Sequence, residues 1–227
     1  MTTLRTLAVP GVGPEDVLLD ASGETILTGT NDGAIWSLTR DGVQIRRVAH
    51  TDGRPLGLEW LPDGRLLVCD AERGLLAVDL DGGHIEELVT QVDGVVLRFT
   101  NNAAVAADGT IYFTDSSRHY SIDEWKSDLI AHTLTGRLFR RSPDGEVTTL
   151  LDRLGFANGV ALTADGSQVW VAETALSQIR RIDTATARDL GTITGLPGYP
   201  DNIARGSDDL IWVAVAAPPD PTLGVLQ

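Results

Sequence analysis

Residues 101–115 read NNAAVAADGTIYFTD, which is an apolar run, a turn and a second apolar run. The Asp-Gly pair at the turn supplies the positive φ that a tight hairpin needs, so the stretch predicts two antiparallel strands. Four other stretches have the same arrangement: EDVLLDASGETILTGT at 15–30, LGLEWLPDGRLLVCD at 56–70, NGVALTADGSQVWVAET at 158–174 and DNIARGSDDLIWVAV at 201–215. A third strand-like run follows each of the first four hairpins: GAIWSLT at 33–39, GLLAVDL at 74–80, GRLFRRS at 136–142 and SQIRRID at 177–183. Such internal repetition indicates a repeat fold.

The turn positions recur at a regular spacing. They are Gly23, Gly64, Gly109, Gly166 and Asp209, separated by 41, 45, 57 and 43 residues. A four-stranded propeller blade takes about 40 to 45 residues, so three of the four spacings match one blade. A two-sheet sandwich is also all-β, but it does not predict a hairpin that recurs so regularly. The sequence therefore predicts an all-β propeller.

A column of residues lies eight positions before these turns, at the expected start of each innermost strand: Glu15, Leu56, Asn101, Asn158 and Asp201. In a propeller these strand starts surround one end of the central channel, so the five side chains are expected to converge there. Two carboxylates and two amides suit calcium or another hard divalent cation, whereas zinc prefers nitrogen and sulfur ligands. The alternative is that Asn and Asp serve only as turn formers at strand entrances. Leu56, the apolar member, is expected in the wall of the pocket.

The next column along the strands contains Asp16, Gly57, Asn102, Gly159 and Asn202. Its three polar members, Asp16, Asn102 and Asn202, have three open interpretations. They orient the ligands of the first column through hydrogen bonds, they form a second ion site deeper in the channel, or they are turn caps whose hydrogen bonds are already satisfied.

Composition excludes several classes of function. The 227 residues carry 32 acidic and 18 basic side chains, a net charge of −14, which argues against a nucleic-acid partner because phosphate binding relies on basic patches. Cys69 is the only cysteine, so no intrachain disulfide and no cysteine-rich zinc site can form. The sequence has neither a signal-peptide core nor an apolar run of about 20 residues, so we expect a cytoplasmic protein that does not cross a membrane.

The longest spacing marks an insertion, SSRHYSIDEWKSDLIAHTLTG at 116–136. Ser121 and Glu124 match a capping box, and apolar residues at helical spacing that include Trp125 predict a short helix over about 121–133. Strand direction places this helix on the face of the metal column, where it forms either a lid over the pocket or a surface elaboration. Trp125 and His119 are candidate pocket residues, with His119 either shuttling protons or simply solvated. Asp115, at the end of a second strand on the same face, either orients substrate or caps a turn.

Four segments carry a resemblance to a known family: FTNNAAVAADGTIYFTDSS at 99–117, GRLFRRSPDGEVTTLL at 136–151, FANGVALTADGSQVWVAET at 156–174 and LPGYPDNIARGSDDLIWVAV at 196–215. Together they resemble the strictosidine synthase-like branch of the gluconolactonase, regucalcin and paraoxonase superfamily of calcium-dependent six-bladed propellers. In the metal-dependent hydrolases of that superfamily a Glu, two Asn and an Asp bind the catalytic calcium. Motif by motif, these ligands fall on Glu15, Asn101, Asn158 and Asp201.

The resemblance implies a hydrolase of lactones or related esters that acts on a small-molecule substrate. Calcium would polarise the carbonyl group, Asp201 would act as general base or nucleophile, and Asn101 would hold metal and substrate. The alternative from another class is a calcium-stabilised propeller that binds a small molecule without turning it over. A metal-free condensing enzyme of the strictosidine synthase type is disfavoured, because those enzymes resemble this fold but lack the full set of oxygen ligands.

The length of the chain differs from the family pattern. A six-bladed propeller needs roughly 240 to 270 residues, whereas residues 1–227 contain about four and a half blades and are interpreted as one incomplete propeller domain. We expect either a fragment, an open ring, or a ring that a partner chain closes. An open blade leaves an unpaired strand edge, so self-association through that edge is an expectation as well.

Overall fold

The computed structural model describes residues 4–220. The first four blades are four-stranded antiparallel sheets in which strands follow chain order from the inside outward. Blade 1 contains β1 (Leu18–Leu19), β2 (Thr25–Gly29), β3 (Ala34–Thr39) and β4 (Ile45–His50). Blade 2 contains β5 (Pro55–Trp60), β6 (Leu66–Asp70), β7 (Gly74–Val78) and β8 (Ile85–Val89). Blade 3 contains β11 (Thr100–Val105), β12 (Ile111–Asp115), β13 (Gly136–Arg141) and β14 (Val147–Leu154).

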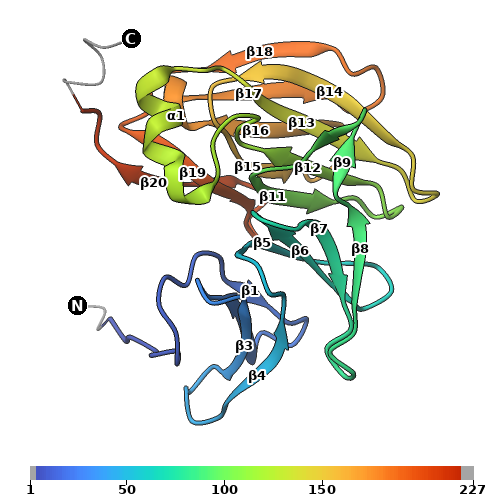
Figure 1. The fold of residues 1–227 in the computed structure, drawn as a ribbon, viewed down its shortest axis with the longest axis vertical. Helices are drawn as coiled ribbons and strands as arrows, with labels where there is room; N and C mark the ends of the chain where they lie inside the picture. The colour runs from blue at the N-terminus through green and yellow to red at the C-terminus, as the bar shows by residue number, and fades with distance from the viewer. Residues whose placement is uncertain (1–3, 221–227) are drawn as a thin grey trace.

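Blade 4 contains β15 (Ala157–Leu162), β16 (Gln168–Glu173), β17 (Gln178–Asp183) and β18 (Asp189–Ile193). A two-stranded sheet of β19 (Tyr199–Arg205) and β20 (Ile211–Ala217) follows, and β9 (Gln91–Val92) pairs with β10 (Val95–Val96) in the connection between blades 2 and 3. Figure 1 shows the inner strands β5, β11, β15 and β19 meeting near the centre while β4, β8, β14 and β18 lie outside. The predicted propeller of about four and a half blades is confirmed for residues 4–220.

Apolar side chains fill the space between neighbouring blades. Leu66 and Val68 of blade 2 pack against Leu27 and Ile35 of blade 1 in one such cluster. Equivalent clusters lie between blades 2 and 3, between blades 3 and 4, and between blade 4 and the β19–β20 hairpin. Blades 2, 3 and 4 therefore bury apolar side chains on both faces, which fixes their inner strands relative to one another.

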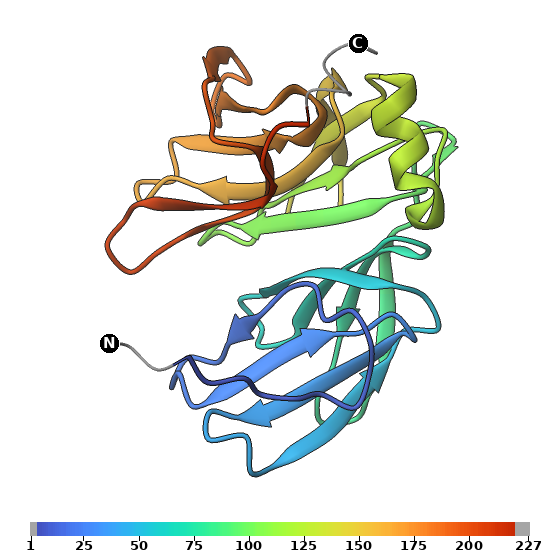
Figure 2. The same cartoon turned by 90° about the vertical axis from the view of Figure 1, so that its left-hand side faces the viewer.

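The predicted helix is present in the insertion of blade 3. A 3₁₀ turn, η1 (Ile122–Glu124), opens with the Ser121–Glu124 capping box and continues into α1 (Trp125–Ala131). A second short 3₁₀ turn, η2 (Thr174–Leu176), follows β16. Figure 2 shows α1 at the end of the blades where β11 begins, which is the face predicted for the metal column. None of the helices within residues 4–220 is both long enough and apolar enough to cross a membrane.

Candidate functional site

Each complete inner strand contains a β-bulge at the column residue. In β11, Asn101 and Asn102 together lie opposite the single residue Thr114 of β12, because Thr100 pairs with Asp115 and Ala103 pairs with Phe113. The same two-against-one register occurs at 56–57, at 158–159 and at 201–202. A bulge re-aims the side chains of the extra residue and is frequent beside active sites. Simple strand alternation therefore does not apply here, and both columns are turned toward the channel region.

Glycine at the second bulge position allows the inner strands to lie close together. A Cβ atom built on Gly57 would stand 2.8 Å from the backbone oxygen of Asn101, and one on Gly159 would stand 2.3 Å from the backbone nitrogen of Ile203. Both contacts are too short for a real Cβ atom. The two glycines thus permit the approach that brings neighbouring column residues within reach of one another.

The column residues are linked by hydrogen bonds from their amide nitrogens. Asn158 Nδ2 donates to Asp201 Oδ1 at 2.7 Å and to Thr174 Oγ1 at 3.1 Å. Asn101 Nδ2 donates to Ser116 Oγ at 2.9 Å, and the Ser116 hydroxyl donates onward to a backbone carbonyl of the neighbouring blade. These bonds fix which end of each amide faces outward. Consequently, both amide oxygens are left available on the opposite side.

Three oxygens of the column are buried and accept no hydrogen bond within residues 4–220: Glu15 Oε2, Asn101 Oδ1 and Asn158 Oδ1. Buried polar atoms are hydrogen-bonded in the great majority of cases, so three such oxygens in one column require an explanation. A divalent cation with oxygen ligands satisfies them together. No cluster of three or more His, Cys, Asp or Glu side chains suited to a metal occurs in the described chain. A cation here therefore depends on the two asparagines as well as the carboxylates.

The electrostatics of the column also fit a cation. The pKa of Glu15 is raised to about 8, first by burial and then by the neighbouring carboxylates of Asp16 and Asp201, while Asn202 and Arg54 act in the opposite direction. Burial likewise raises the pKa of Asp201, against the hydrogen bond from Asn158. Both shifts mean that the folded protein disfavours negative charge at this point. A bound divalent cation would reverse that preference and keep both carboxylates ionised.

The polar residues of the second column accept or donate hydrogen bonds between blades. Asp16 Oδ2 accepts the backbone N–H of Leu58 at 2.9 Å and Asp16 Oδ1 accepts that of Val17 at 2.8 Å. Asn102 Oδ1 accepts the backbone N–H of Val160 at 3.1 Å. Asp16 thus connects blade 1 to β5, and Asn102 connects β11 to β15, while the second-ion interpretation stays untested. The observed bonds agree with the interpretation in which their hydrogen bonds are already satisfied.

Asn202 supports the first column directly. Its Nδ2 donates to Glu15 Oε1 at 3.0 Å, although the two residues are 187 positions apart in sequence. Glu15 precedes β1 and Asn202 lies in β19, so this bond joins the first blade to the fifth hairpin. It also explains why only Oε2 of Glu15 is left without a partner.

Two cavities lie on either side of the column along the inner strands. The larger, of about 560 Å³, includes Glu59 and Arg205 and follows the strands deeper into the channel. The smaller, of about 380 Å³, opens at the strand starts and is lined by Asn31, Arg54, Glu72, Ile122, Asp123 and Trp125. Trp125 thus lines a cavity, with 42% of its surface exposed, and its place in a substrate pocket stays a prediction. The smaller cavity therefore adjoins η1 and the start of α1.

Leu56 lies in an apolar cluster beside the column, and its place in a substrate pocket stays a prediction. It is 2% exposed and packs with Phe99, Phe156 and Leu129 in an apolar cluster at the strand starts. Phe99 and Phe156 each lie two residues before an asparagine of the column, and their rings meet edge to face at 5.2 Å between centroids. Leu129 comes from α1, so this cluster attaches the lid helix to the blades and keeps water from one side of the column.

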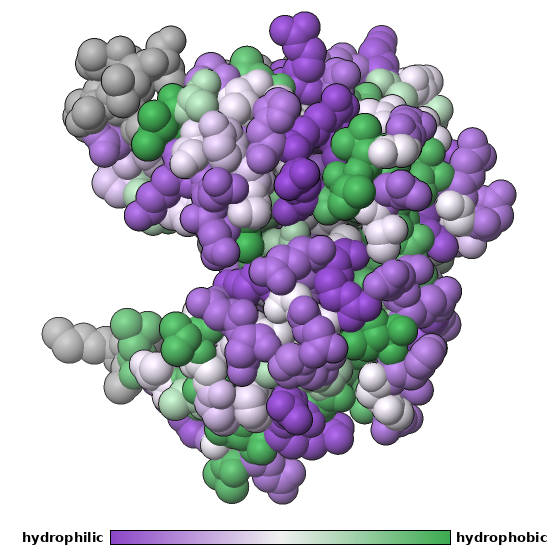
Figure 3. All heavy atoms as spheres, viewed as in Figure 1, coloured by the Kyte–Doolittle hydropathy of each residue, from purple (hydrophilic) through white to green (hydrophobic). Residues whose placement is uncertain are grey.

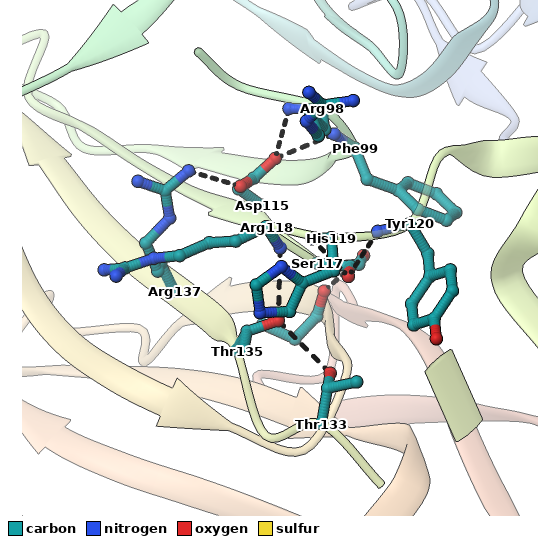
Figure 4. A network of polar contacts seen from close by, with 12 residues as sticks. Arg98, Phe99, Asp115, Ser117, Arg118, His119, Tyr120, Thr133, Thr135 and Arg137 are labelled. Carbon is teal, nitrogen blue, oxygen red and sulfur yellow. Dashed lines mark hydrogen bonds and ion pairs between the residues drawn. The ribbon is translucent and has the colours of Figure 1, made fainter. Parts of the chain in front are cut away.

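Asp115 is a structural residue, which corrects its assignment to the pocket wall. It is fully buried, and its Oδ2 forms a 2.6 Å ion pair with Arg137 Nη2, itself 2% exposed. Its Oδ1 accepts the backbone N–H groups of Arg98 and Phe99, as the dashed lines in Figure 4 show. Burial places Asp115 under the apolar cluster, with no access to a cavity. Its carboxylate instead holds the start of β11, which carries Asn101.

The same bond occurs in the neighbouring blades. Asp70 Oδ1 accepts the backbone N–H of Arg54 at 2.9 Å, and Glu173 Oε2 accepts that of Gly155 at 2.8 Å. In blades 2, 3 and 4 an acidic residue at the end of the second strand thus anchors the chain just before the inner strand. His119 has an exposed side chain, which agrees with the solvated interpretation rather than with a proton shuttle.

Two residues of the site region were not recognised from the sequence. Asp128 of α1 is 1% exposed, and its Oδ2 accepts hydrogen bonds from Ser117 Oγ at 2.5 Å and from Thr133 Oγ1 at 2.6 Å. These two neighbours, Ser117 and Thr133, belong to the hydrogen-bond network in Figure 4. The second of these residues is Arg54. It lies two residues before Leu56 of the column, and this fixed sequence offset could have identified it.

Comparisons with known proteins agree with this architecture. The family model for strictosidine synthase matches residues 101–185, and that for the N-terminal part of strictosidine synthase-like proteins matches residues 1–38. Adipocyte plasma membrane-associated protein of Salmo salar is 36% identical over 95% of this chain and 56% of its own length. Protein strictosidine synthase-like 6 of Arabidopsis thaliana is 34% identical over 90% of this chain and 58% of its own. The chain thus spans less than two thirds of these relatives.

Solved structures share the fold at lower sequence identity. A putative gluconolactonase superposes with a TM-score of 0.77 at 22% identity, covering 93% of this chain and 74% of that one. A calcium-binding regucalcin of Agrobacterium tumefaciens gives a TM-score of 0.70 at 17% identity, covering 91% of this chain and 68% of that one. At these identities the similarity shows a common propeller fold.

Proposed function

The chain belongs to the strictosidine synthase-like branch of the gluconolactonase, regucalcin and paraoxonase superfamily of propellers, and on this premise we propose that it is a calcium-dependent hydrolase of lactones or related esters. Calcium, or another divalent cation of similar preference, would be held by Glu15, Asn101, Asn158 and Asp201. The observation that carries the proposal is the set of three buried column oxygens without a hydrogen-bond partner within residues 4–220. Four oxygen donors of mixed charge leave positions for substrate and water.

A bound cation would supply Lewis acidity toward the carbonyl oxygen of a lactone or ester. Asp201 Oδ1 accepts the Asn158 amide, so within residues 4–220 its Oδ2 is the oxygen left to take a proton from an attacking water or to attack the carbonyl carbon. Asn101 is fixed by Ser116, which orients its oxygen toward the column. The Phe99 and Phe156 rings exclude water on the side of the strand starts, which strengthens the electrostatic interactions of the site.

The experiment is a hydrolysis assay on a panel of five- and six-membered lactones and simple aryl esters, run with calcium, with chelator, and with calcium restored. We expect turnover that chelator abolishes and calcium restores, and a Glu15→Gln chain that needs far more calcium for the same rate. Turnover that chelator leaves unchanged would contradict the proposal.

A second candidate function is a propeller that binds calcium and a small molecule without turnover. The shared fold extends to a protein described as a calcium-binding regucalcin, and the small cavity beside the column is of a size for a small ligand. In that case chelator lowers the melting temperature, yet no member of the panel is hydrolysed. The two candidates therefore give different results in one set of assays.

A further inference from the structure

Arg54 occupies an unusual position at the entrance to the column. It lies in the connection between β4 and β5, two residues before Leu56 of the column. In the next two blades the residue at this same offset, two before the column asparagine, is Phe99 or Phe156. An arginine thus stands where the two neighbouring blades carry aromatic rings. Its side chain is half-buried, so its charge is only partly solvated.

The guanidinium of Arg54 has donors to spare. Nη1 donates to the backbone oxygen of Pro55 at 3.1 Å, and Nη2 donates to that of Gly13 at 3.0 Å. A guanidinium has five N–H donors, so these two carbonyls leave three unused. No carboxylate within residues 4–220 lies within ion-pair distance of it. The guanidinium of Arg54 is therefore a half-buried cation whose hydrogen-bond partners within residues 4–220 are both neutral carbonyl groups.

The unused donors border the cavity of about 380 Å³ at the strand starts. The lid helix region contributes Trp125 and Ile122 to the same cavity, so an aromatic surface and a guanidinium share one space. Figure 3 shows the surface hollowed between the N-terminal blades and the upper part of the molecule, with hydrophilic residues along much of the rim. Glu72 and Asp123, which also line the cavity, are exposed, so the cavity is open to a small molecule from solvent.

The electrostatic environment of Arg54 depends on whether a cation is bound at the column. Burial lowers the pKa of Arg54, while Glu15, Asp70 and Glu72 favour its charged form through space. A cation bound to Glu15 would neutralise one of these three carboxylates. The guanidinium would then be less well compensated than before, and an anion beside it would become more favourable.

We propose that Arg54 is a specificity-determining residue that binds a carboxylate group of the substrate, while Trp125 contacts a flat or apolar part of the same molecule. This inference rests on the proposed function for the position of the reacting bond, which would lie at the column. A planar guanidinium matches a carboxylate with two parallel hydrogen bonds, so it distinguishes an acid from a neutral analogue of the same shape. The substrate class is accordingly a lactone or ester that bears a carboxylate.

Two acidic residues that line the cavity oppose the binding of an anion there. Glu72 and Asp123 are exposed, so water and salt screen their charges. They also provide a test, because removal of the Glu72 charge should strengthen the binding of an anion at Arg54. A role for Arg54 that is limited to holding the Gly13 backbone predicts no such effect.

The experiment compares benzoate with benzamide, which has nearly the same shape but no charge. Binding to the full chain in saturating calcium is measured by ligand-observed NMR, with no turnover required. We expect benzoate to bind about tenfold tighter than benzamide, the scale of a hydrogen bond to a charged group. The ratio of benzoate affinity to benzamide affinity should fall to about one in Arg54→Gln and be partly kept in Arg54→Lys. Arg46→Gln, which removes the same charge from the exposed outer strand β4, should keep the full preference.

Equal affinity for the two probes in the wild-type chain, or a preference that survives Arg54→Gln, would overturn the inference. Glu72→Gln should tighten benzoate binding without changing that of benzamide, and an unchanged ratio there would also count against it. This second variant leaves the hydrogen bonds to Gly13 and Pro55 intact, so it tests the idea even if Arg54→Gln fails to fold. Because the readout is binding, a preserved preference in a protein without lactone turnover would refute the proposed reaction and not this inference.

Discussion

The side-chain amide of Asn158 donates a 2.7 Å hydrogen bond to Oδ1 of Asp201, although the two residues come from different inner strands, β15 and β19. This bond fixes both side chains at once. It commits one carboxylate oxygen of Asp201, and it turns the Asn158 oxygen away to where it has no hydrogen-bond partner within residues 4–220. The proposed cation site depends on this orientation.

Replacement of Asn158 by Leu is expected to abolish the rise in melting temperature that calcium produces. Leucine has the same branching at Cγ but no oxygen ligand, so calcium binding no longer stabilises the folded state by mass action. The measurement is thermal unfolding with calcium and with chelator. A response equal to that of the wild-type chain would remove Asn158 from the site.

Asn102→Leu is the matched control for that variant. Its oxygen already accepts the backbone N–H of Val160, so its loss should lower the melting temperature by a similar amount with calcium and with chelator. A loss of the calcium response in this control would mean that the second column also contributes ligands.

Asp201→Asn should keep the fold and some calcium binding but lower lactone turnover at least about a hundredfold, the usual scale for losing a positioned base. Asparagine can still accept the Asn158 hydrogen bond, so stability should change little. Steady-state kinetics on any accepted lactone test this, with the exposed Asp165→Asn as control. Near-normal activity in Asp201→Asn would place the base or nucleophile elsewhere.

The pKa of Glu15, raised to about 8, predicts a pH dependence that calcium removes. Without cation, the folded state holds a proton on Glu15 that the unfolded chain releases near its ordinary pKa of 4.5. The melting temperature in chelator should therefore fall as pH rises from about 5 to about 8. Calcium affinity should increase over the same interval, because the ion displaces that proton. Scanning calorimetry from pH 5 to pH 8 measures the melting temperature with calcium and with chelator. The same dependence of melting temperature on pH in both conditions would contradict the assignment of Glu15 to the cation site.

The repeat and the column could be predicted from sequence because both depend on local spacing. Turn glycines set the blade period, and Glu15, Asn101, Asn158 and Asp201 share one offset from them. The roles of Asp16 and Asn102 could not be predicted, because they depend on which backbone N–H group of the next blade lies opposite. Strand alternation also failed at the column, since the bulges there are set by pairing between strands and not by any single stretch of sequence.

Asp115→Ala should lower the free energy of unfolding by about 3 to 5 kcal/mol, because it leaves the buried Arg137 without its partner. Asp189→Ala, which removes an exposed partner of Arg180, should change it by less than about 1 kcal/mol. Chemical denaturation measures both. If Asp115→Ala were instead as stable as the wild-type chain and changed only KM, Asp115 would belong to the substrate pocket.

We propose that the chain self-associates through β20, as the sequence led us to expect. Within residues 4–220 this strand pairs only with β19, and Trp212 on it is 63% exposed. An unpaired strand edge with apolar side chains is a template for pairing with another chain. Sedimentation velocity should show a concentration-dependent increase in mass that Trp212→Lys reduces. A monomer at all concentrations would exclude this contact.

The central claim is that the column binds one cation, and the most direct measurement is calorimetric titration of calcium into the chelator-treated chain at pH 8. The account predicts one ion bound per chain, with binding lost in a Glu15→Gln, Asn158→Leu double variant that still unfolds cooperatively. No binding to the wild-type chain, or undiminished binding to the double variant, would contradict it.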